Sequence, residues 1–334
     1  MERKSSSQET TPRLVVLPLE GVVNRYPEQW AKWLPAAWPE ALFVPGEPLT
    51  DRVETGAWLD VFSTWHYKGT QLARVARMMR DGEIRDGDIL LLMDAWFPLE
   101  GLFYMIEAAG MSIRVAGVLH AGAYDPHDFL SRRGMRWAQG FEKAVFRRLD
   151  LVVVFSEFHK RLLKEEVGVN PARVIVCDFP YVLSDLDWYH NGNTRKHDVC
   201  FPHRLDPEKC PETVELMVSA GLSVCVTSGM SRDEYYQALA SSRYVFSWAW
   251  QETYGISIME GQYLGAHPVL PRRLSYEELY PRECLFPSIR SAINHMAECK
   301  PTSLQGPHMK WKDSCRRLAT RVMGAFGAWE VSVE

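Results

Sequence analysis

WAWQETYGISIMEGQYLGAHP, residues 248–268, contains a complete strand–helix–strand step. The apolar run Tyr244–Ser247 precedes it, the chain turns at Thr253–Gly255, and a helical pattern follows over Ile256–Gly265. A second apolar run, His267–Leu270, comes directly afterwards. Two strands joined through a helix run parallel, because the connection must cross back over the sheet. The segment therefore predicts a parallel α/β fold.

The same alternation continues along the chain. The other predicted strands are continuous apolar runs at Leu14–Leu17, Ile89–Met93, Val115–Leu119, Leu151–Phe155, Val174–Cys177, Val199–Phe201 and Ser223–Thr227. The other predicted helices are Lys68–Met79, Leu99–Ala109, Met135–Leu149, Glu157–Val167, Glu212–Ala220, Arg232–Ser241 and Met309–Phe326. Because several of these runs are continuously apolar rather than alternating, we expect helices on both faces of the sheets.

Composition narrows the class of protein. The chain has 334 residues, 46% of them hydrophobic, and a formal net charge of −4, which excludes a surface that is basic overall. No run reaches the roughly 18 apolar residues of a membrane span, and residues 1–12 form a polar tail that we expect to be disordered. The seven cysteines form no C-x-x-C pair. We therefore expect a reduced, cytoplasmic protein without structural zinc.

One polar, turn-rich stretch, residues 184–197, interrupts the alternation. We interpret it as a linker between two Rossmann-like domains, residues 13–183 and 198–308. Residues 309–334 contain the predicted C-terminal helix, which is expected to cross back to the N-terminal domain.

Two glutamates lie on the opening segment, Glu252 before the predicted helix and Glu260 inside it. The helix N-terminus at Tyr254, Gly255 and Ile256 offers backbone N–H groups to a phosphate. Glu252 would then accept hydrogen bonds from sugar hydroxyls, and Glu260 from a ribose. The alternative interpretation is a glutamate favoured by the helix dipole and a second one on the surface.

A second candidate element is CFPHRLDPEKCPE, residues 200–212, between a predicted strand and a predicted helix. Arg204 offers a planar fork of donors and Lys209 a point charge, so the two together suit a diphosphate. An ordinary polar turn is the alternative.

Two further candidates follow strands of the first half. His120 comes after Val115–Leu119, and Asp94 comes after Ile89–Met93. Asp94 is a candidate for binding a substrate that accepts a transferred group, or for taking up the proton of that substrate. The alternatives are a structural histidine and a helix-capping aspartate.

Aromatic and basic residues of the first half are candidates for contacts with nucleic acid. Stacking on a base is expected of His66, Trp96 and Tyr124, with Trp65, Tyr67 and Phe97 beside them. Phosphate contacts are expected of Arg132, Arg133, Arg136, Lys143, Arg147 and Arg148. The alternative is a set of core aromatics and a solvated helix face.

Two D-x-D patterns, Asp86–Asp88 and Asp185–Asp187, have the form found in metal-dependent transferases. Both lie in turn-like contexts, where aspartate is common. We interpret them as turn residues and predict no metal site.

The glutamate pair and the segment Gly265–Val269 after it resemble the E-x7-E element of retaining glycosyltransferases with the GT-B fold, family 4 type. Arg204 and Lys209 are similar in placement to the basic pair of that family's G-R-L-x-P-E-K-G element. The resemblance implies two Rossmann-like parallel-sheet domains facing across a cleft. The first would bind the acceptor and the second the nucleotide-sugar.

The resemblance also implies roles for the matching residues. The first glutamate, Glu252, would bind the donor sugar and the second, Glu260, the nucleotide ribose. Arg204 and Lys209 would neutralise the leaving diphosphate, and His120 would approach the reacting sugar. Together with Asp94, a candidate by its position after a strand, His120 and Glu252 are the expected catalytic residues.

This chain departs from the family pattern at several positions. Thr253-Tyr254 replaces the usual Gly-Phe, Gly261 the usual alanine, and Pro202-His203 the usual glycine. The glycine-rich turn after the first strand is reduced to Gly21. The loop facing the sugar is therefore bulkier than is usual.

One branch resembles this chain more than others do, namely proteins similar to the tRNA-queuosine mannosyltransferase. The shared patterns are P-H-R-x-x-x-x-K at 202–209, an aspartate–tyrosine pattern at 233–236 and a counterpart of a P-E-x-F/L-Y-P stretch at 276–281. The first half also resembles phage transferases that glycosylate hydroxymethylated DNA bases. Both resemblances imply an acceptor on nucleic acid.

From these resemblances we expect a retaining, metal-independent glycosyltransferase that uses a UDP- or GDP-sugar, UDP being favoured, and no other cofactor. The expected acceptor is a hydroxyl on a modified base, a hydroxymethylated pyrimidine in DNA first and a tRNA base second. No membrane partner is expected, and a phage-encoded enzyme would act in the host cytoplasm. The alternatives are a lipid, glycan or small-molecule acceptor, and a non-catalytic protein that binds nucleotide-sugar or nucleic acid. The sequence carries no signal for the oligomeric state.

Overall fold

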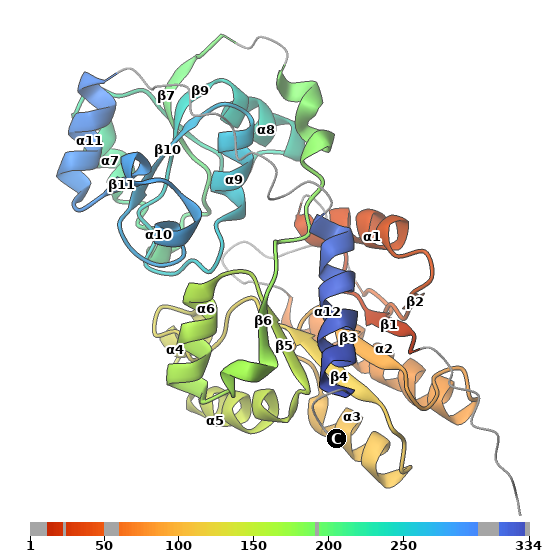
Figure 1. Cartoon of the computed structure of the whole chain (residues 1–334). Helices are drawn as coiled ribbons and strands as arrows, with labels where there is room; N and C mark the ends of the chain where they lie inside the picture. Colours follow the sequence, from red (N-terminus) through yellow and green to blue (C-terminus); the bar gives the residue numbers. More distant parts are fainter. Residues whose placement is uncertain (1–11, 23–24, 50–59, 191–193, 300–313, 331–334) are drawn as a thin grey trace, which may run out of the picture. The chain divides into compact units, whose positions relative to one another are not determined.

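The computed structural model describes residues 12–22, 25–49, 60–190, 194–299 and 314–330 (Figure 1). Contacts between Cα atoms divide the chain into two compact units. Unit 1 comprises Met1–Leu119, Arg148–Val152 and Val322–Glu334, and unit 2 comprises His120–Arg147 and Val153–Arg321. Of the predicted polar tail, residues 1–11 lie outside the described residues.

The first sheet has six strands in the order β2-β1-β3-β4-β5-β6. They are β1 (Leu14–Leu17), β2 (Leu42–Phe43), β3 (Ile89–Leu92), β4 (Arg114–Val118), β5 (Leu151–Val154) and β6 (Val174–Val176). Strand β1 runs parallel to both β2 and β3, and β3 runs parallel to β4. Every residue of β1, β3 and β5 is buried. Burial on both faces explains the continuous apolar runs in the sequence.

The second sheet has five strands in the order β11-β10-β9-β7-β8. They are β7 (His197–Phe201), β8 (Val224–Val226), β9 (Ser242–Phe246), β10 (His267–Pro271) and β11 (Leu285–Phe286). All four pairs of neighbours are parallel. The parallel α/β fold predicted from the sequence is therefore confirmed in both sheets.

Helices cover both faces of the second sheet. They are α7 (Thr213–Ser219), α8 (Arg232–Ala240), α9 (Ile256–Tyr263) and α11 (Ile289–Glu298), with the short α10 (Tyr276–Leu279) after β10. Met217 of α7 and Ile293 of α11 share one core with Val199, Phe246 and Val269 of the strands. Helices α8 and α9 lie on the opposite face (Figure 1). The strand–helix–strand step at residues 242–271 is thus β9–α9–β10, as predicted.

The helices associated with the first sheet largely follow the predicted periodicity. They are α1 (Tyr26–Ala37), α2 (Val61–Arg80), α3 (Leu99–Ala108), α4 (Phe129–Arg132), α5 (Arg136–Val145) and α6 (Glu157–Leu162), which continues as one π-helical turn over Leu163–Val167. Helix α1 was not predicted. Pro27 occupies its first turn and Pro35 lies inside it, while Trp30, Trp33 and Leu34 are its buried face.

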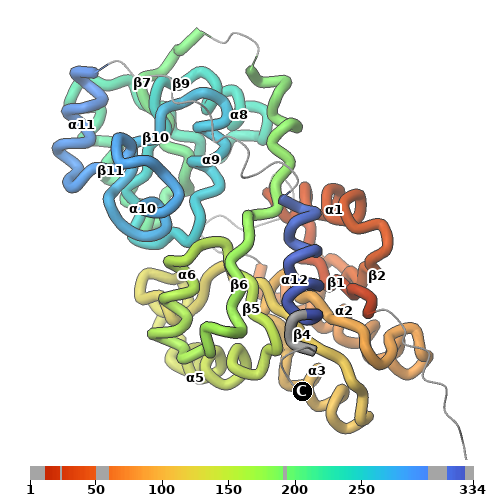
Figure 2. Tube along the Cα trace, in the orientation of Figure 1, coloured from red at the N-terminus to blue at the C-terminus, as the bar shows by residue number. Residues whose placement is uncertain are grey.

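The segment predicted to be a linker is not irregular throughout, because a 3-10 helix spans Leu183–His190. Leu183 and Leu186 of this helix are buried, so their apolar spacing was a missed signal. The Cα trace runs from β6 through this helix to β7 (Figure 2). The domain boundaries drawn from the sequence remain a prediction.

The C-terminal helix is α12 (Ser314–Glu330); residues 309–313 of the predicted helix lie outside the described residues. Phe326 of α12 packs under the Arg114 guanidinium of β4, whose Cζ lies 4.9 Å from the ring centroid. The Arg114 Nη1 also donates to the Phe326 carbonyl at 3.3 Å. These contacts lie within unit 1 and attach the end of α12 to the edge of β4.

The aspartates of the two D-x-D patterns make structural contacts. Arg13 forms an ion pair with Asp88 at 2.7 Å, and Asp86 accepts a hydrogen bond from the Ser112 backbone. Asp187 accepts from the Tyr263 hydroxyl. Within the described ranges, no three His, Cys, Asp or Glu side chains are grouped so as to hold a metal ion. None of the described helices combines the length and apolarity needed to span a membrane.

Candidate functional site

The turn before α9 depends on glycine. Gly255 has a φ of 86°, in the left-handed region that side chains rarely adopt. A Cβ at this position would lie 3.0 Å from Cε1 of Tyr276. Glycine is therefore needed for both the backbone conformation and the close packing at the helix N-terminus.

The carboxylate of Glu252 contacts the N-terminus of α9. Its Oε1 accepts from the Gly255 backbone N–H at 3.0 Å, and its Oε2 lies 3.3 Å from Nζ of Lys209. Burial alone would raise the pKa of Glu252, but the positive charge of Lys209, the nearby His203 and hydrogen bonding hold the pKa below its usual value. Glu252 is therefore an ionised carboxylate at a fixed position.

Lys209 reaches the carboxylate of Glu252 because the chain turns sharply at residues 207–210. The residue ends a short 3-10 helix, Pro207–Lys209, and Cys210 follows with a φ of 56°. Its Nζ also donates to the Gln251 carbonyl at 2.7 Å. The lysine is 9% exposed, so solvent screens its charge weakly. Lys209, Glu252 and the N-terminus of α9 are thus brought together within unit 2.

Arg204 is held by carboxylates of its own segment. Its guanidinium pairs with Asp206 and, at 2.5 Å, with Oε1 of Glu208. The other oxygen of Glu208 lies 2.7 Å from Nη2 of Arg132. An anion that binds Arg204 would therefore have to share or displace these carboxylates.

His203, which stands where the family pattern has glycine, is buried in the same segment as Arg204 and Lys209. Burial, followed by the positive charge of Lys209, lowers the pKa of His203 to about 3, so the ring is neutral near pH 7. Its buried Nε2 has no hydrogen-bond partner among the described residues. A buried polar atom without a partner is unusual and is a reason to expect a ligand nearby.

Glu260 lies deeper, on α9, and accepts hydrogen bonds from three tyrosines. The hydroxyls of Tyr181 and Tyr236 donate to Oε1, and the Tyr235 hydroxyl donates to Oε2 at 2.6 Å. Burial raises the pKa of Glu260, and the three tyrosine hydrogen bonds oppose that rise. Glu260 is 6% exposed, so it is not the surface glutamate of the alternative interpretation.

His120 lies just after β4, and its backbone carbonyl accepts from the Thr253 hydroxyl at 2.9 Å. Tyr124, predicted to stack on an acceptor base, is instead 5% exposed. Its hydroxyl lies 2.6 Å from Nε2 of His159, a fully buried histidine whose pKa is lowered to about 3 by burial and then by His120. Tyr124 therefore packs inside unit 2 and does not present its ring to a base.

The remaining acceptor candidates lie in unit 1. Asp94 forms an ion pair with Lys68 at 2.7 Å and accepts from the Trp96 backbone N–H at 3.0 Å, so it is already engaged. His66 and Trp96 are partly exposed, and Trp65 is 43% exposed. Tyr67 and Phe97 are buried.

Several of the basic residues predicted to follow phosphates bind the protein itself. Arg132 pairs with Glu208, Arg133 packs over Phe129, Arg147 donates to the Val167 carbonyl, and Arg148 pairs with Glu107. These four residues are exposed, and each side chain nevertheless has a contact within the protein that the charge pattern alone did not indicate.

Sequence reasoning missed three groups that contact or adjoin the candidate residues. Tyr181 was not singled out, although it follows a predicted strand. His159 was not singled out either, because a helical histidine carries no signal of its burial. Gln251 was overlooked beside Glu252; its side-chain amide donates to Asp128 at 2.9 Å.

Comparison with known proteins gives a family match for part of the chain. Residues 23–177 match the model of Glycosyltransferase Family 4, which is less than half of the 334 residues. The tRNA-queuosine alpha-mannosyltransferase of Drosophila melanogaster is 32% identical over 80 residues. Those residues are 24% of this chain and 21% of the relative, so the match spans about a fifth of the relative's length.

Solved structures share the fold over almost the whole chain. The sucrose-phosphate synthase of Thermosynechococcus elongatus superposes with a TM-score of 0.59 at 13% identity, covering 96% of both chains. An alpha-glucosyltransferase solved with UDP and a 13-mer DNA containing a central A:G mismatch gives a TM-score of 0.54 at 10% identity. That match covers 93% of this chain and 99% of the other. The chain therefore has the GT-B fold of glycosyltransferase enzymes, with a Glycosyltransferase Family 4 match in its first half.

Proposed function

We propose that this protein is a retaining, metal-independent glycosyltransferase that moves a sugar from a nucleotide-sugar to a hydroxyl on a modified nucleic-acid base. The observation that carries the proposal is the ion pair of Lys209 and Glu252 at the N-terminus of α9. A buried cation and the N–H groups of a helix start suit a diphosphate, and an ionised carboxylate beside them suits sugar hydroxyls.

The donor side of the reaction follows from these groups. Lys209, Arg204 and the N-terminus of α9 bind the diphosphate, Glu252 accepts from the sugar, and Glu260 accepts from the ribose. The C1–oxygen bond to the diphosphate breaks, and its electron pair stays with the leaving group. Since positive charges that are already in place stabilise this leaving group, no metal ion is required.

Retention follows if the acceptor attacks the face from which the diphosphate leaves. The acceptor oxygen bonds to C1 through an oxocarbenium-like state, and its proton passes to the departing phosphate oxygen. His120 and Glu252 position the sugar, and Asp94 of unit 1 is a candidate for binding the acceptor.

His203 supports the donor assignment. Its neutral ring and its unpartnered Nε2 lie in the segment that carries Arg204 and Lys209. A polar group of a bound nucleotide-sugar would satisfy this nitrogen. UDP is the favoured nucleotide, as in the DNA-bound glucosyltransferase of similar fold.

The nucleic-acid acceptor is proposed from one sequence relative, one structure of similar fold and one exposed aromatic patch. The sequence relative is a tRNA-queuosine alpha-mannosyltransferase, and the structure of similar fold is an alpha-glucosyltransferase solved with UDP and DNA. In unit 1, the first turns of α2 expose Phe62 (83%) and Trp65 (43%) close in sequence to His66. Exposed aromatic rings suit stacking on a base. A hydroxymethylated pyrimidine in DNA is favoured over a tRNA base.

The test is a mass shift on digested nucleosides. The protein is incubated with UDP- and GDP-sugars and, separately, with hydroxymethylated DNA, unmodified DNA, tRNA, and a panel of lipid, glycan and small-molecule acceptors. We expect a hexose-sized gain on the hydroxymethylated base, unchanged by EDTA. Loss of transfer in EDTA would contradict metal independence, and transfer only to non-nucleic-acid acceptors would contradict the acceptor. Binding of nucleotide-sugar without any turnover would favour a non-catalytic protein.

A further inference from the structure

Thr253, which occupies a position where the family pattern has glycine, is bound from two sides. Its hydroxyl donates to the His120 carbonyl at 2.9 Å. Its own carbonyl accepts from the Ser156 hydroxyl at 2.7 Å. All three residues belong to unit 2. A glycine could keep the second hydrogen bond but has no side chain for the first.

The carbonyls on either side of Thr253 are restrained together with its own. Lys209 donates to the Gln251 carbonyl at 2.7 Å, and the Ser275 hydroxyl lies 3.4 Å from the Glu252 carbonyl. Together with the Ser156 contact, three successive carbonyls accept from side chains of three different segments. The backbone that carries Glu252 therefore has little freedom to rotate.

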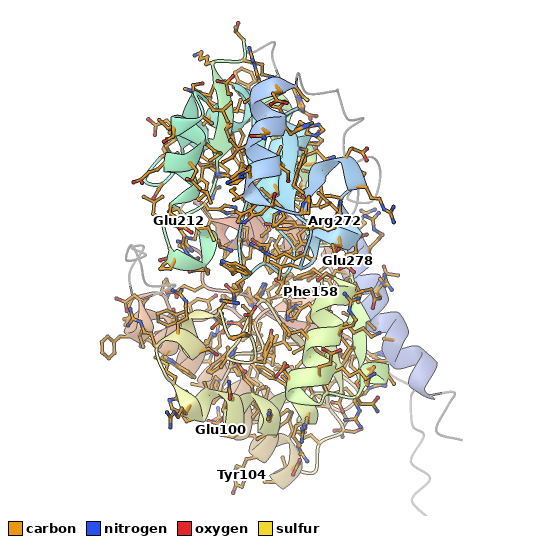
Figure 3. All side chains as sticks on the ribbon, turned by 90° about the vertical axis from the view of Figure 1, so that its left-hand side faces the viewer. Glu100, Tyr104, Phe158, Glu212, Arg272 and Glu278 are labelled. Carbon is orange, nitrogen blue, oxygen red and sulfur yellow. The ribbon has the colours of Figure 1, made fainter. Side chains whose placement is uncertain are left out.

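Ser156 is itself well fixed, so its contact with Thr253 is a rigid one. The serine caps α6, and its hydroxyl oxygen accepts from the His159 backbone N–H at 3.2 Å. In the first turn of the same helix, the Phe158 N–H lies 3.3 Å from the carboxylate of Glu278. Both residues are labelled in Figure 3. A carboxylate at a helix N-terminus is stabilising.

We infer that Thr253 is a positioning residue whose hydroxyl sets the placement of Glu252 relative to the His120 loop. The inference rests on the proposed function, in which Glu252 and His120 contact the same sugar. Only one peptide bond separates Thr253 from Glu252, so a hydrogen bond from Thr253 to residue 120 restrains both groups at once. Small displacements of positioned groups reduce rates strongly while affecting binding less.

The test compares Thr253→Val, which keeps the shape and removes the hydroxyl, with Thr253→Ser, which keeps the hydroxyl. For Thr253→Val we expect kcat to fall about tenfold, with KM for the donor and the affinity for UDP within about twofold of wild type. Thr253→Ser should restore most of kcat. A purely structural role predicts instead a lower Tm with unchanged kcat of the folded fraction.

The control is Thr320→Val on α12, which loses a comparable hydroxyl-to-carbonyl bond, at 3.1 Å to Arg316. It should leave kcat unchanged. Equal kcat in Thr253→Val and wild type, or equal impairment in Thr253→Ser and Thr253→Val, overturns the inference and leaves the proposed function intact.

A second readout does not need activity. Hydrogen exchange of peptides covering residues 118–124 and 250–256 should be faster in Thr253→Val than in wild type and Thr253→Ser. Unchanged exchange in both peptides overturns the inference. If the wild-type protein turns over no nucleotide-sugar, the proposed function fails, and the exchange result still decides whether Thr253 restrains the two segments.

Discussion

The segments at residues 200–212 and 248–268 differ from the segment at residues 60–97 in how the structure places their candidate site residues. In the first two, Lys209 and Glu252 meet as an ion pair at a helix N-terminus. In the third, Asp94 is bound to Lys68, while Tyr67 and Phe97 are buried.

The difference has a physical reason. A motif of fixed spacing constrains the turn and the helix start, so it predicts on which local element each side chain lies. A count of aromatic or basic residues constrains neither burial nor partners. Predictions drawn from motif spacing therefore deserve more weight here than those drawn from composition.

The largest effect is expected from Lys209→Met, which removes the buried cation of the proposed donor site. Loss of a positioned positive charge should lower kcat by about 100- to 1,000-fold. It should also leave Glu252 buried without its counter-charge. Steady-state kinetics with the best donor measure the effect, and Lys164→Met, on an exposed lysine, is the control. Near-normal kcat would remove Lys209 from the proposed mechanism.

Gly255→Ala tests whether the turn before α9 is as demanding as its geometry indicates. The left-handed conformation alone should cost about 1–2 kcal/mol, and the contact with Tyr276 should add to it. Gly229→Ala is a matched control, because Gly229 has a φ of 87° but no atom lies within 4 Å of the place where its Cβ would stand. Urea unfolding should show a larger loss for Gly255→Ala; equal losses would show that Tyr276 yields without cost.

Comparing Trp65→Ala with Tyr124→Phe tests which of the two aromatic residues contacts the acceptor. Loss of a stacking ring should raise KM for a nucleic-acid acceptor about tenfold in Trp65→Ala. Tyr124→Phe should leave that KM unchanged and lower the free energy of unfolding by about 1–3 kcal/mol, because His159 loses its partner. A raised KM for the acceptor in Tyr124→Phe, with an unchanged KM in Trp65→Ala, would instead assign Tyr124 to the acceptor site.

The smallest effect is the pH dependence of stability in Glu252→Gln and Glu260→Gln. The pKa of Glu252 is lowered on folding, so its ionised form stabilises the protein above about pH 4.5 and that contribution is lost as pH falls. The pKa of Glu260 is raised, so its ionisation destabilises the protein as pH rises above about 4.5. The advantage of wild type should therefore shrink toward low pH against Glu252→Gln and grow against Glu260→Gln. Parallel urea curves from about pH 3 to pH 7 measure both, and equal slopes would contradict the assigned environments.

Local sequence patterns were enough to locate most elements of the fold. Strand β1 has the predicted bounds, Leu14–Leu17, and the step through α9 was foreseen because an apolar run, a glycine turn and a helical period follow one another. Helix α1 was missed because proline obscures its period. The 3-10 helix at Leu183–His190 was missed because its polar residues resemble a loop.

By itself, the sequence determined the parallel α/β class and the neighbourhood of Glu252, because spacing and glycine placement act over a few residues. Only the tertiary structure decided which partners those residues have. The three tyrosines on Glu260, the carboxylates on Arg204 and the Thr253–His120 bond are contacts that the sequence pattern did not indicate. Such contacts form when the chain packs, and burial then sets the charge of each group, as in the neutral ring of His203.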